Sequence, residues 1–382
     1  MYQLSEEHIM LRNMVRDLAA DKVAPRAAEI DEQDEFPWDL KELFAANDLL
    51  ALPFPEKYGG TGSDSLMFCL AMEEIARVSA SASMVPGDHA LGSYPLVIGC
   101  GEEQRERFFP VLARGERLAA FALTEAGAGS DAAGIRTLAV RDGDHYVLNG
   151  QKTFITQAGI ADLYTVFAST APGKGVKGIS CFIVEKEAPG FRVGKLERKM
   201  GIHGSPTGEL LFEDCRVPAG NLISSEGDGF RLAMQTLDKS RPGIAAQAVG
   251  IGQGAIDCAA KYATERIQFG QPIAQFQGIQ FMIADMETQV AAARELTYKA
   301  ASLLDRKDRE ATKYSAMCKM FASDVAMKVT TDAVQILGGY GYIMDYPVER
   351  MMRDAKVTQI YEGTNQVQRL VIARAVMGQY AR

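Results

Sequence analysis

A glutamate near the C-terminus, Glu362, stands where one helical segment is expected to end and another to begin. Residues 359–366 read QIYEGTNQ, and an amphipathic segment at about 344–360 leads into them. Gly363 breaks the helix, and Thr364 can cap the helix that follows. A carboxylate at such a break, behind an aromatic side chain and between apolar helices, is poorly hydrated and becomes a candidate base. Taken alone, the local sequence favours a simpler interpretation, a helix-terminal glutamate in water.

A glycine-rich run at residues 121–131, FALTEAGAGSD, has the composition of a ligand-binding loop. Its glycines allow close backbone approach, and exposed amides with the hydroxyls of Thr124 and Ser130 suit a pyrophosphate or a flavin edge. The run is not a Walker motif, because no Gly-Lys-Ser/Thr follows it. By itself the segment is more often an ordinary turn than a ligand site.

Residues 149–156, NGQKTFIT, predict a hairpin turn followed by a strand of aromatic, aliphatic and hydroxyl side chains. On that strand Phe154 could pack against a planar ring while Thr156 donates a hydrogen bond. The alternative is a plain hairpin with one core aromatic, and the segment alone favours it.

Two further segments carry groups that suit phosphate or ligand contact. RIQFG at residues 266–270 offers the guanidinium of Arg266, and QILGG at residues 335–339 offers a glycine-lined surface. Each also fits an ordinary loop after a helix. Asp238 and Arg241 are three residues apart, which on a helix predicts a surface ion pair.

One motif is rejected. VGIGQGA at residues 249–255 matches the dinucleotide-binding pattern, which requires a preceding strand and an acidic residue about twenty positions later. A helical alanine-rich segment precedes it instead, and residues 271–277 contain no acid. Small residues for close helix packing explain the run better than nicotinamide binding does.

The composition limits the classes of function. The chain has 382 residues with 47% hydrophobic and 24% charged residues, which is ordinary for a globular protein of two or three domains. A net charge of −8 argues against nucleic-acid binding. The six cysteines form no CxxC pair and the four histidines no metal-binding spacing, so we expect free thiols and no metal. No apolar run is long enough to span a membrane. The acidic, helix-like N-terminus is unlike a secretory signal, so we expect a cytoplasmic protein.

The elements that must position these residues fall into three blocks. Residues 1–118 predict helices punctuated by proline and glycine, including apolar-periodic stretches at about 64–78 and 90–113. Residues 119–225 predict a small antiparallel sheet or barrel of short β-branched and aromatic strands. Residues 226–382 predict long helices that are apolar on several faces. Such helices need partners beyond one domain, so an oligomeric bundle is expected.

Taken in order, six segments resemble the acyl-CoA dehydrogenase family over essentially the whole chain: TEAGAGSD, NGQKTFIT, DKSR, RIQFG, QILGG and IYEGTNQ. The chain looks most similar to the short- and medium-chain and related bacterial branch. The resemblance implies an α+β fold with a helical N-terminal domain, a middle antiparallel β domain and a C-terminal four-helix bundle. It also reverses the simpler interpretation of Glu362, which matches the family's catalytic base.

The resemblance assigns roles to further residues. The positions that match contacts to FAD, several made across a subunit boundary, are Leu123, Thr124, Ser130, Phe154, Thr156, Arg266, Phe269, Gln277, Gln335, Gly338, Gly339, Thr364 and Gln366. The positions that match the substrate side are Ser130, Asp238, Arg241, Tyr361 and Gly363.

Three positions bear on how far the resemblance carries. The family commonly has Trp where Phe154 stands and Pro where Ala126 stands, so the aromatic face is kept without the indole N–H and the loop is less stiff. In the isovaleryl and long-chain branches the base precedes the arginine that matches Arg241. Here that residue is Ser240, which cannot serve as a base, so Glu362 has no rival.

The resemblance implies α,β-desaturation of an acyl-CoA thioester. Glu362 would take the Cα proton while a hydride leaves Cβ for flavin N5, and the electrons would pass to an electron-transferring flavoprotein, as in β-oxidation. In the family the base's own backbone N–H and a flavin ribityl hydroxyl stabilise the enolate oxygen, at about 3–4 kcal/mol per donor. Substrate binding would dry the site and raise the pKa of Glu362 toward neutrality. A homotetramer is the expected assembly.

The acyl group is the open question. Residues 83–91, SMVPGDHAL, lie where the family lines its acyl pocket, and Asp88 and His89 are polar for a pocket that serves simple fatty chains. A solvated or core-satisfied pair is one interpretation. The other is that one of them contacts a functionalised or cyclic acyl group, such as a cyclohexene-carbonyl thioester, with Asp88 as an extra acid or base.

Two other classes of protein remain as alternatives. A flavin-dependent acyl-CoA oxidase would use the same fold, but the chain lacks the large C-terminal extension of many such oxidases. A non-enzymatic binding or assembly protein is the other alternative, and the presence of Glu362 and the flavin motifs argues against it.

Overall fold

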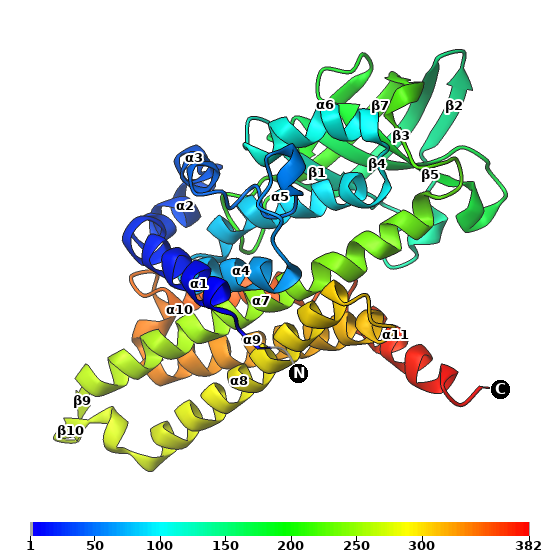
Figure 1. Ribbon diagram of the computed structural model, residues 1–382. Helices are drawn as coiled ribbons and strands as arrows, with labels where there is room; N and C mark the ends of the chain where they lie inside the picture. The colour runs from blue at the N-terminus through cyan, green and yellow to red at the C-terminus, as the bar shows by residue number, and fades with distance from the viewer. Residues whose placement is uncertain (1–2, 382) are drawn as a thin grey trace.

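The structure is a computed structural model that describes residues 3–381. Helices come first, then a sheet, then long helices, as Figure 1 shows by colour along the chain. The expected order of α, β and α segments is therefore confirmed.

The N-terminal helices are α1 (Glu6–Leu18), α2 (Ala27–Gln33), α3 (Trp38–Ala46), α4 (Ser65–Ala76), α5 (Ala80–Gly99) and α6 (Glu102–Ala113). Asp64 and Ser79 cap α4 and α5 by accepting hydrogen bonds from backbone N–H groups in the first turns. The apolar stretch expected at about 90–113 is split between α5 and α6 at Cys100 and Gly101. Helices α4 and α5 both pack against α7 of the C-terminal block, so the helical blocks share a boundary.

The middle segment folds into an eight-stranded sheet with the main order β6-β7-β3-β2-β4-β5-β8, and β1 pairs with β4. The strands are β1 (Ala119–Ala122), β2 (Leu138–Asp142), β3 (His145–Thr156), β4 (Leu163–Ser169), β5 (Ile179–Glu185), β6 (Phe191–Leu196), β7 (Thr207–Pro218) and β8 (Leu222–Ile223). Most pairs are antiparallel, as expected, but β1 and β2 each meet β4 in parallel.

The hairpin turn predicted at Asn149 and Gly150 is wrong. Strand β3 runs through both residues, and its register against β7 shifts between Leu148 and Gly150, which marks a bulge. Gly150 has a φ of 148°, and a Cβ there would lie 2.7 Å from the Thr137 hydroxyl. Bulges and turns both select glycine, so the dipeptide was ambiguous. The real two-residue turn between β2 and β3 contains Gly143.

The C-terminal helices are α7 (Gly229–Glu265), α8 (Gln277–Asp305), α9 (Ala311–Leu337), α10 (Val348–Thr358) and α11 (Asn365–Gly378). The first three form a bundle with α10, while α11 packs on α9 and extends away from the bundle (Figure 1). A two-stranded hairpin of β9 (Ile267–Gln268) and β10 (Gln271–Pro272) joins α7 to α8 at one end of the bundle.

The glycines of the rejected dinucleotide motif lie inside α7. A Cβ on Gly250 would come within 2.3 Å of the Glu73 carbonyl oxygen, and one on Gly254 within 2.0 Å of the Arg77 carbonyl oxygen. Both carbonyls belong to the C-terminal end of α4 and its cap. These glycines therefore allow α4 and α7 to touch through their backbones, which confirms the packing interpretation.

Three compositional expectations can be compared with the structure. All six cysteines are free thiols, and only Cys258 is partly exposed. Within residues 3–381 no group of acidic, histidine or cysteine side chains is arranged to hold a metal ion. No helix in that range has the length and hydropathy needed to cross a membrane.

Candidate active site

The loop between α10 and α11 turns through a left-handed backbone conformation. Glu362 has a φ of 51° and Gly363 a φ of 91°, and Thr364 caps α11 by accepting a hydrogen bond from the Val367 N–H at 3.3 Å. Gly363 tolerates this conformation, but a left-handed glutamate costs roughly 1–2 kcal/mol. The surroundings must therefore hold Glu362 in place.

Side chains from three helices hold the two carbonyl groups of this turn. The Glu362 carbonyl accepts hydrogen bonds from Arg241 Nε at 3.4 Å and Gln368 Nε2 at 3.2 Å. The Gly363 carbonyl accepts from Lys319 Nζ at 2.8 Å and Gln368 Nε2 at 2.9 Å. Arg241, Lys319 and Gln368 are themselves buried, so α7, α9 and α11 together fix the backbone at Glu362.

The Glu362 carboxylate is bound by the residue at the alternative base position. Ser240 Oγ donates a hydrogen bond to Glu362 Oε2 at 2.5 Å. Burial raises the pKa of Glu362 to about 7, against the lowering effects of the Ser240 hydrogen bond and the charges of Arg241 and Lys319. A carboxyl group with such a pKa is half ionised near neutrality, which suits a general base.

The predicted surface ion pair of α7 is in fact largely buried. Arg241 Nη1 donates to Asp238 Oδ1 at 2.7 Å, and the Arg241 side chain is only 5% exposed. Asp238 also accepts a hydrogen bond from Thr312 Oγ1 at 2.7 Å. The spacing predicted the ion pair correctly but not its burial, which depends on α9 and on the loop around Glu362 (residues 359–364) packing over it.

Helix α5 contributes a buried carboxyl group next to the same loop. Burial, followed by the nearby charge of Glu362, raises the pKa of Asp88 well above its usual range, and Ser205 Oγ lies 3.4 Å from Asp88 Oδ2. Tyr361 donates a hydrogen bond to Gln247 on α7, and its pKa is raised by burial and by the charges of Glu362 and Asp88. Asp88, Tyr361 and Glu362 therefore form one electrostatic cluster.

His89 lies apart from this cluster. Its Nδ1 accepts a hydrogen bond from the Ala119 N–H at 3.3 Å, and its ring packs against Phe54. Burial lowers the pKa of His89 to about 4, so the side chain is neutral. His89 is therefore a neutral side chain packed in the core, while Asp88 is a buried carboxyl group close enough to feel the charge of Glu362.

The residues of the sheet that were predicted to contact the flavin are brought together by β1 and β3. The Leu123 carbonyl accepts from the buried Lys152 Nζ at 3.0 Å, and the Thr124 carbonyl accepts from the Thr153 N–H at 2.9 Å. Lys152 also pairs with Glu125 at 2.7 Å, which fixes the start of the glycine-rich run. Ser130 lies at the exposed far end of that run.

Phe154 is an exposed aromatic in a strained backbone conformation. Its φ is 55° and 64% of its surface is accessible, so it is not the core aromatic that the simpler interpretation expected. Successive side chains of a strand point to opposite faces of the sheet, and the left-handed conformation of Phe154 breaks this alternation in β3. Thr156 follows at the end of the strand, and Gln157 Nε2 lies 3.4 Å from the Met84 carbonyl oxygen on α5. Tyr361 also approaches Met84, so the end of β3 and the loop around Glu362 meet on α5.

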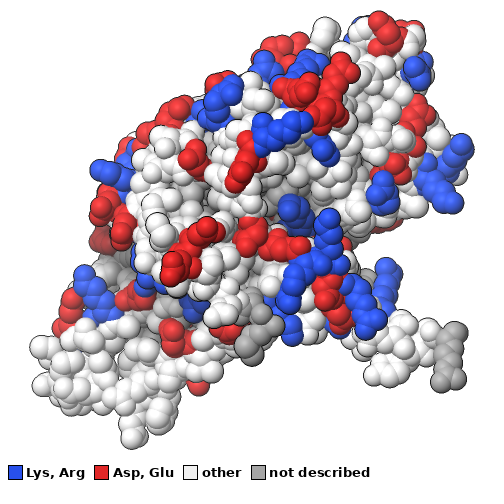
Figure 2. Space-filling model, in the orientation of Figure 1, with Lys and Arg blue, Asp and Glu red and all other residues white. Residues whose placement is uncertain are grey.

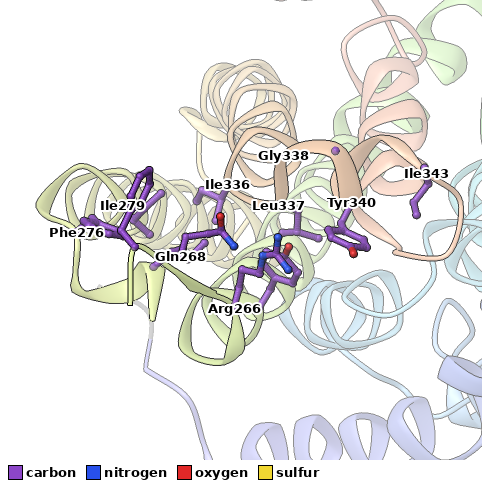
Figure 3. Close-up of a pocket in the computed structure, with 13 residues that line it drawn as sticks. Arg266, Gln268, Phe276, Ile279, Ile336, Leu337, Gly338, Tyr340 and Ile343 are labelled. Carbon is purple, nitrogen blue, oxygen red and sulfur yellow. The ribbon is translucent and has the colours of Figure 1, made fainter. Parts of the chain in front are cut away.

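A cavity of about 680 Å³ lies at the opposite end of the bundle, beside β9 and β10 (Figure 3). Arg266, Phe269, Gly338 and Gly339 line it, and Arg266 lies 5.3 Å over the ring of Tyr340. Gln277 and Gln335 flank these lining residues in the sequence but are not part of the lining. An arginine and two glycines beside aromatic side chains suit a phosphate and a flat ring.

The predicted cofactor residues therefore form two groups within one chain. Gln157, directly after β3, and Tyr361 in the Glu362 loop both approach Met84 on α5, and Thr364 and Gln366 lie at the start of α11 next to that loop. The cavity residues lie at the far end of α9, with Lys319 and Gly338 separated by roughly 28 Å along that helix at its usual rise. A single chain therefore offers two partial sites rather than one continuous site.

Sequence reasoning missed four side chains that hold the site. Lys319, Gln247 and Gln368 were not singled out, and Ser240 was considered only as a failed base. A signal existed for Lys319, since it interrupts the otherwise uncharged run AMCKMFAS at residues 316–323. A charge on an apolar helix face indicates a buried partner.

Comparison with known proteins gives a consistent result. Three family profiles match in order: "Acyl-CoA dehydrogenase, N-terminal domain" over residues 5–116, the "middle domain" over 120–215 and the "C-terminal domain" over 227–377. Cyclohex-1-ene-1-carbonyl-CoA dehydrogenase of Geobacter metallireducens is 51% identical, over 99% of this chain and 100% of that protein.

Two solved structures are also similar over nearly their whole length. Butyryl-CoA dehydrogenase from Megasphaera elsdenii has a TM-score of 0.96 at 45% identity, over 99% of this chain and 100% of that one. A chain from a structure that concerns the electron transferring flavoprotein of Acidaminococcus fermentans has a TM-score of 0.97 at 48% identity, over 99% of both chains.

Proposed function

The chain belongs to the acyl-CoA dehydrogenase family of FAD-dependent oxidoreductases, and we propose that it desaturates a short- or medium-chain acyl-CoA between Cα and Cβ with Glu362 as the base. The single observation that carries the proposal is the Glu362 carboxyl group itself. It lies at a strained, side-chain-braced turn with its pKa raised to about 7.

The residues present fit FAD. The exposed Phe154 offers a flat face on the strand that also carries Thr156, Thr124 accepts a backbone hydrogen bond from that strand, and the bundle-end cavity offers Arg266 and two glycines. When bound, FAD supplies the acceptor for the hydride that leaves Cβ. The chain's own residues orient the thioester and take the Cα proton.

The backbone beside Glu362 supports stabilisation of the enolate. The Glu362 N–H has no hydrogen-bond acceptor within residues 3–381, so it is available to a thioester oxygen. Such a fixed donor commonly contributes about 3–4 kcal/mol in the transition state. Ser240 holds the carboxylate and Arg241 holds the backbone carbonyl of Glu362 itself, so proton acceptance at the carboxylate requires no rearrangement of the loop.

The experiment that tests this function is anaerobic mixing of the purified yellow protein with a series of acyl-CoAs. We expect butyryl- or octanoyl-CoA to bleach the flavin absorbance near 450 nm. If no acyl-CoA in the series bleaches it, the proposed function is wrong.

A second candidate substrate is a cyclic or functionalised acyl-CoA. Two features support it: the buried Asp88 beside Glu362, and the 51% identity to a cyclohex-1-ene-1-carbonyl-CoA dehydrogenase. In a cyclohex-1-ene-1-carbonyl thioester Cα is bonded to the carbonyl carbon and to two ring carbons, one of them through the double bond, so it carries no hydrogen and the proton must leave another ring carbon. Asp88 would accept that proton when it is ionised.

Turnover of butyryl-, octanoyl- and cyclohexene-carbonyl-CoA by the wild type and Asp88→Asn separates these candidates. If Asp88 acts on the cyclic substrate, the variant loses that turnover by about 100-fold or more and keeps the butyryl-CoA rate. If the relative turnover of the three substrates is unchanged in Asp88→Asn, Asp88 takes no part in the reaction.

We also propose an electron-transferring flavoprotein as the acceptor, supported by the likeness to a chain from a structure that concerns one. An acyl-CoA oxidase is the alternative. Hydrogen peroxide formed in stoichiometric amounts in air would establish the oxidase, whereas reduction of an electron-transferring flavoprotein without peroxide supports the dehydrogenase.

An oligomer, and specifically a homotetramer, completes the proposal. Phe269 is 94% exposed at the tip of β9 and β10, and Ile267, Phe281, Tyr342 and Met344 are also exposed. Figure 2 shows this end of the bundle largely free of charged residues on the visible face. An apolar surface of this kind marks an interface, and a second copy there would bring its cavity residues to the neighbouring FAD.

A further inference from the structure

Lys319 is a buried lysine without a carboxylate partner among the residues that the structure describes. It lies on α9, its side chain is inaccessible to water, and it makes no ion pair within 4.0 Å in the part of the chain described. Its Nζ donates to the Gly363 carbonyl at 2.8 Å and to Asn365 Oδ1 at 3.0 Å. Burying an ammonium group between neutral acceptors is costly, so a neutral side chain would serve packing better.

The same face of α9 holds the loop on both sides of Glu362. Asn365, the first residue of α11, donates to Ser323 Oγ at 2.8 Å and to Asp324 Oδ1 at 2.7 Å. Gln359, before the break, donates to the same Asp324 Oδ1 at 2.7 Å. Lys319 is the member of this network that reaches the turn itself, one residue after Glu362.

We propose that Lys319 is a positioning residue for Glu362: it holds the Gly363 carbonyl so that the left-handed turn presents the carboxylate, and its charge favours the ionised base. This inference rests on the proposed function. It assigns to Lys319 no contact with substrate or FAD.

The charges around Glu362 show why Lys319 matters. Helix α7 presents Arg241 with Asp238, α9 presents Lys319 and Asp324, and α5 presents Asp88 and Tyr94, while Tyr361 precedes the base. Asp238 pairs directly with Arg241 and offsets its charge, whereas Lys319 has no such partner.

Both groups titrate near neutrality. Burial lowers the pKa of Lys319 to about 7, opposed first by the charge of Glu362 and strengthened by that of Arg241. Removal of the Lys319 charge therefore raises the pKa of Glu362. Because the base acts in its ionised form, the acidic limb of the rate profile must then move to higher pH.

The test compares three substitutions of Lys319 in the FAD-loaded enzyme, with kcat and KM measured against pH. In Lys319→Met both the hydrogen bond and the charge are lost, and we expect kcat at pH 7 to fall about 10- to 100-fold. KM and FAD content should stay within about twofold of wild type. Lys319→Gln keeps a hydrogen-bond donor, so its kcat should be higher than that of Lys319→Met, but its acidic limb should still lie at higher pH than in the wild type. Lys319→Arg keeps the charge, so its acidic limb should stay at the wild-type pH.

Lys41 provides the matched control. It is a buried lysine on α3, away from the loop, and its ammonium pairs with Glu42. Lys41→Met should leave kcat within about twofold and the acidic limb in place.

The outcomes separate this inference from the proposed function. If none of the acyl-CoAs bleaches the flavin of the wild-type enzyme, the proposed function is wrong. If the wild type bleaches and both Lys319→Met and Lys319→Gln keep its acidic limb, Lys319 has only a structural role and the inference is wrong. If Lys319→Met does not accumulate as a yellow protein, the acidic limbs of the pH–rate profiles of Lys319→Gln and Lys319→Arg are compared instead. Identical acidic limbs in these two variants would show that the inference about Lys319 is wrong.

Discussion

The loop around Glu362 (residues 359–364) and the exposed apolar surface around Phe269 at the end of the bundle lie at different ends of α9. They differ in how many of their contacts a single chain provides. At the loop, side chains from α7, α9 and α11 bind both carbonyls and the carboxylate. At the bundle end, Phe269 stands almost fully exposed beside an open cavity. We therefore expect one chain to build the proposed proton-accepting half of the site alone and to depend on a second copy for part of the proposed cofactor site.

The largest expected effect comes from the loop. Glu362→Gln keeps the size and the hydrogen-bonding capacity of the side chain but removes the base, so flavin bleaching by acyl-CoA should slow by roughly 10³-fold or more. Substrate should still bind, which a shift in the flavin spectrum without reduction would show. Glu103→Gln, at an exposed position on α6, is the control. If the flavin of Glu362→Gln bleaches at the wild-type rate, Glu362 is not the base.

The next effect tests whether the bundle end depends on a second copy. Phe269→Glu places a charge on the exposed apolar tip, so it should disrupt assembly while leaving the fold of a single chain intact. We expect a smaller species by light scattering and at least a several-fold loss of bound FAD by absorbance. Val140→Glu alters an apolar residue on β2 that is also exposed, and should change neither. An unchanged mass with full FAD in Phe269→Glu would show that this surface is not the interface.

A third effect concerns the ionisation of the base. The Ser240 hydrogen bond lowers the pKa of Glu362 toward about 7, so Ser240→Ala should raise it and move the acidic limb of kcat to higher pH. A hydrogen bond to a charged group is worth about 1.5–3 kcal/mol, so kcat at pH 6 should fall about tenfold, with near recovery at pH 9. Ser240→Thr, which keeps the hydroxyl, should stay close to wild type. A limb that does not move in Ser240→Ala would show that Ser240 is irrelevant to ionisation.

The loop was the more predictable of the two regions, because its signals are local. Gly363 as a helix break and Thr364 as a cap follow from residue types at adjacent positions, and both are confirmed. The bundle end gave weaker local signals, and the grouping of Arg266 with Gly338 and Gly339 came from the family resemblance. The structure places these three around one cavity.

Burial and packing between distant segments were not predictable from the sequence. An Asn-Gly pair is compatible with both a hairpin turn and a β-bulge, so the turn predicted at Asn149 and Gly150 was wrong. The ion pair of Asp238 and Arg241 was recognised, but its burial depends on helices far away in the sequence. Lys319 was missed because its partner, the Gly363 carbonyl, lies 44 residues away and belongs to the backbone.

The smallest expected effect asks which contacts hold the loop. Thr364→Ala removes the cap of α11 and should cost about 1 kcal/mol of stability. Because Arg241, Lys319 and Gln368 still bind the two carbonyls, kcat should change by less than about threefold, with a slightly lower melting temperature by calorimetry. Thr364→Ser keeps the capping oxygen and should match wild type. If Thr364→Ala instead lowers kcat as much as Ser240→Ala does, the helix cap rather than the side-chain donors holds Glu362. The conformation of the loop around Glu362 would then depend on its local sequence alone. The loop would differ from the exposed end of the bundle in its burial, and not in hydrogen bonds from side chains of α7 and α9.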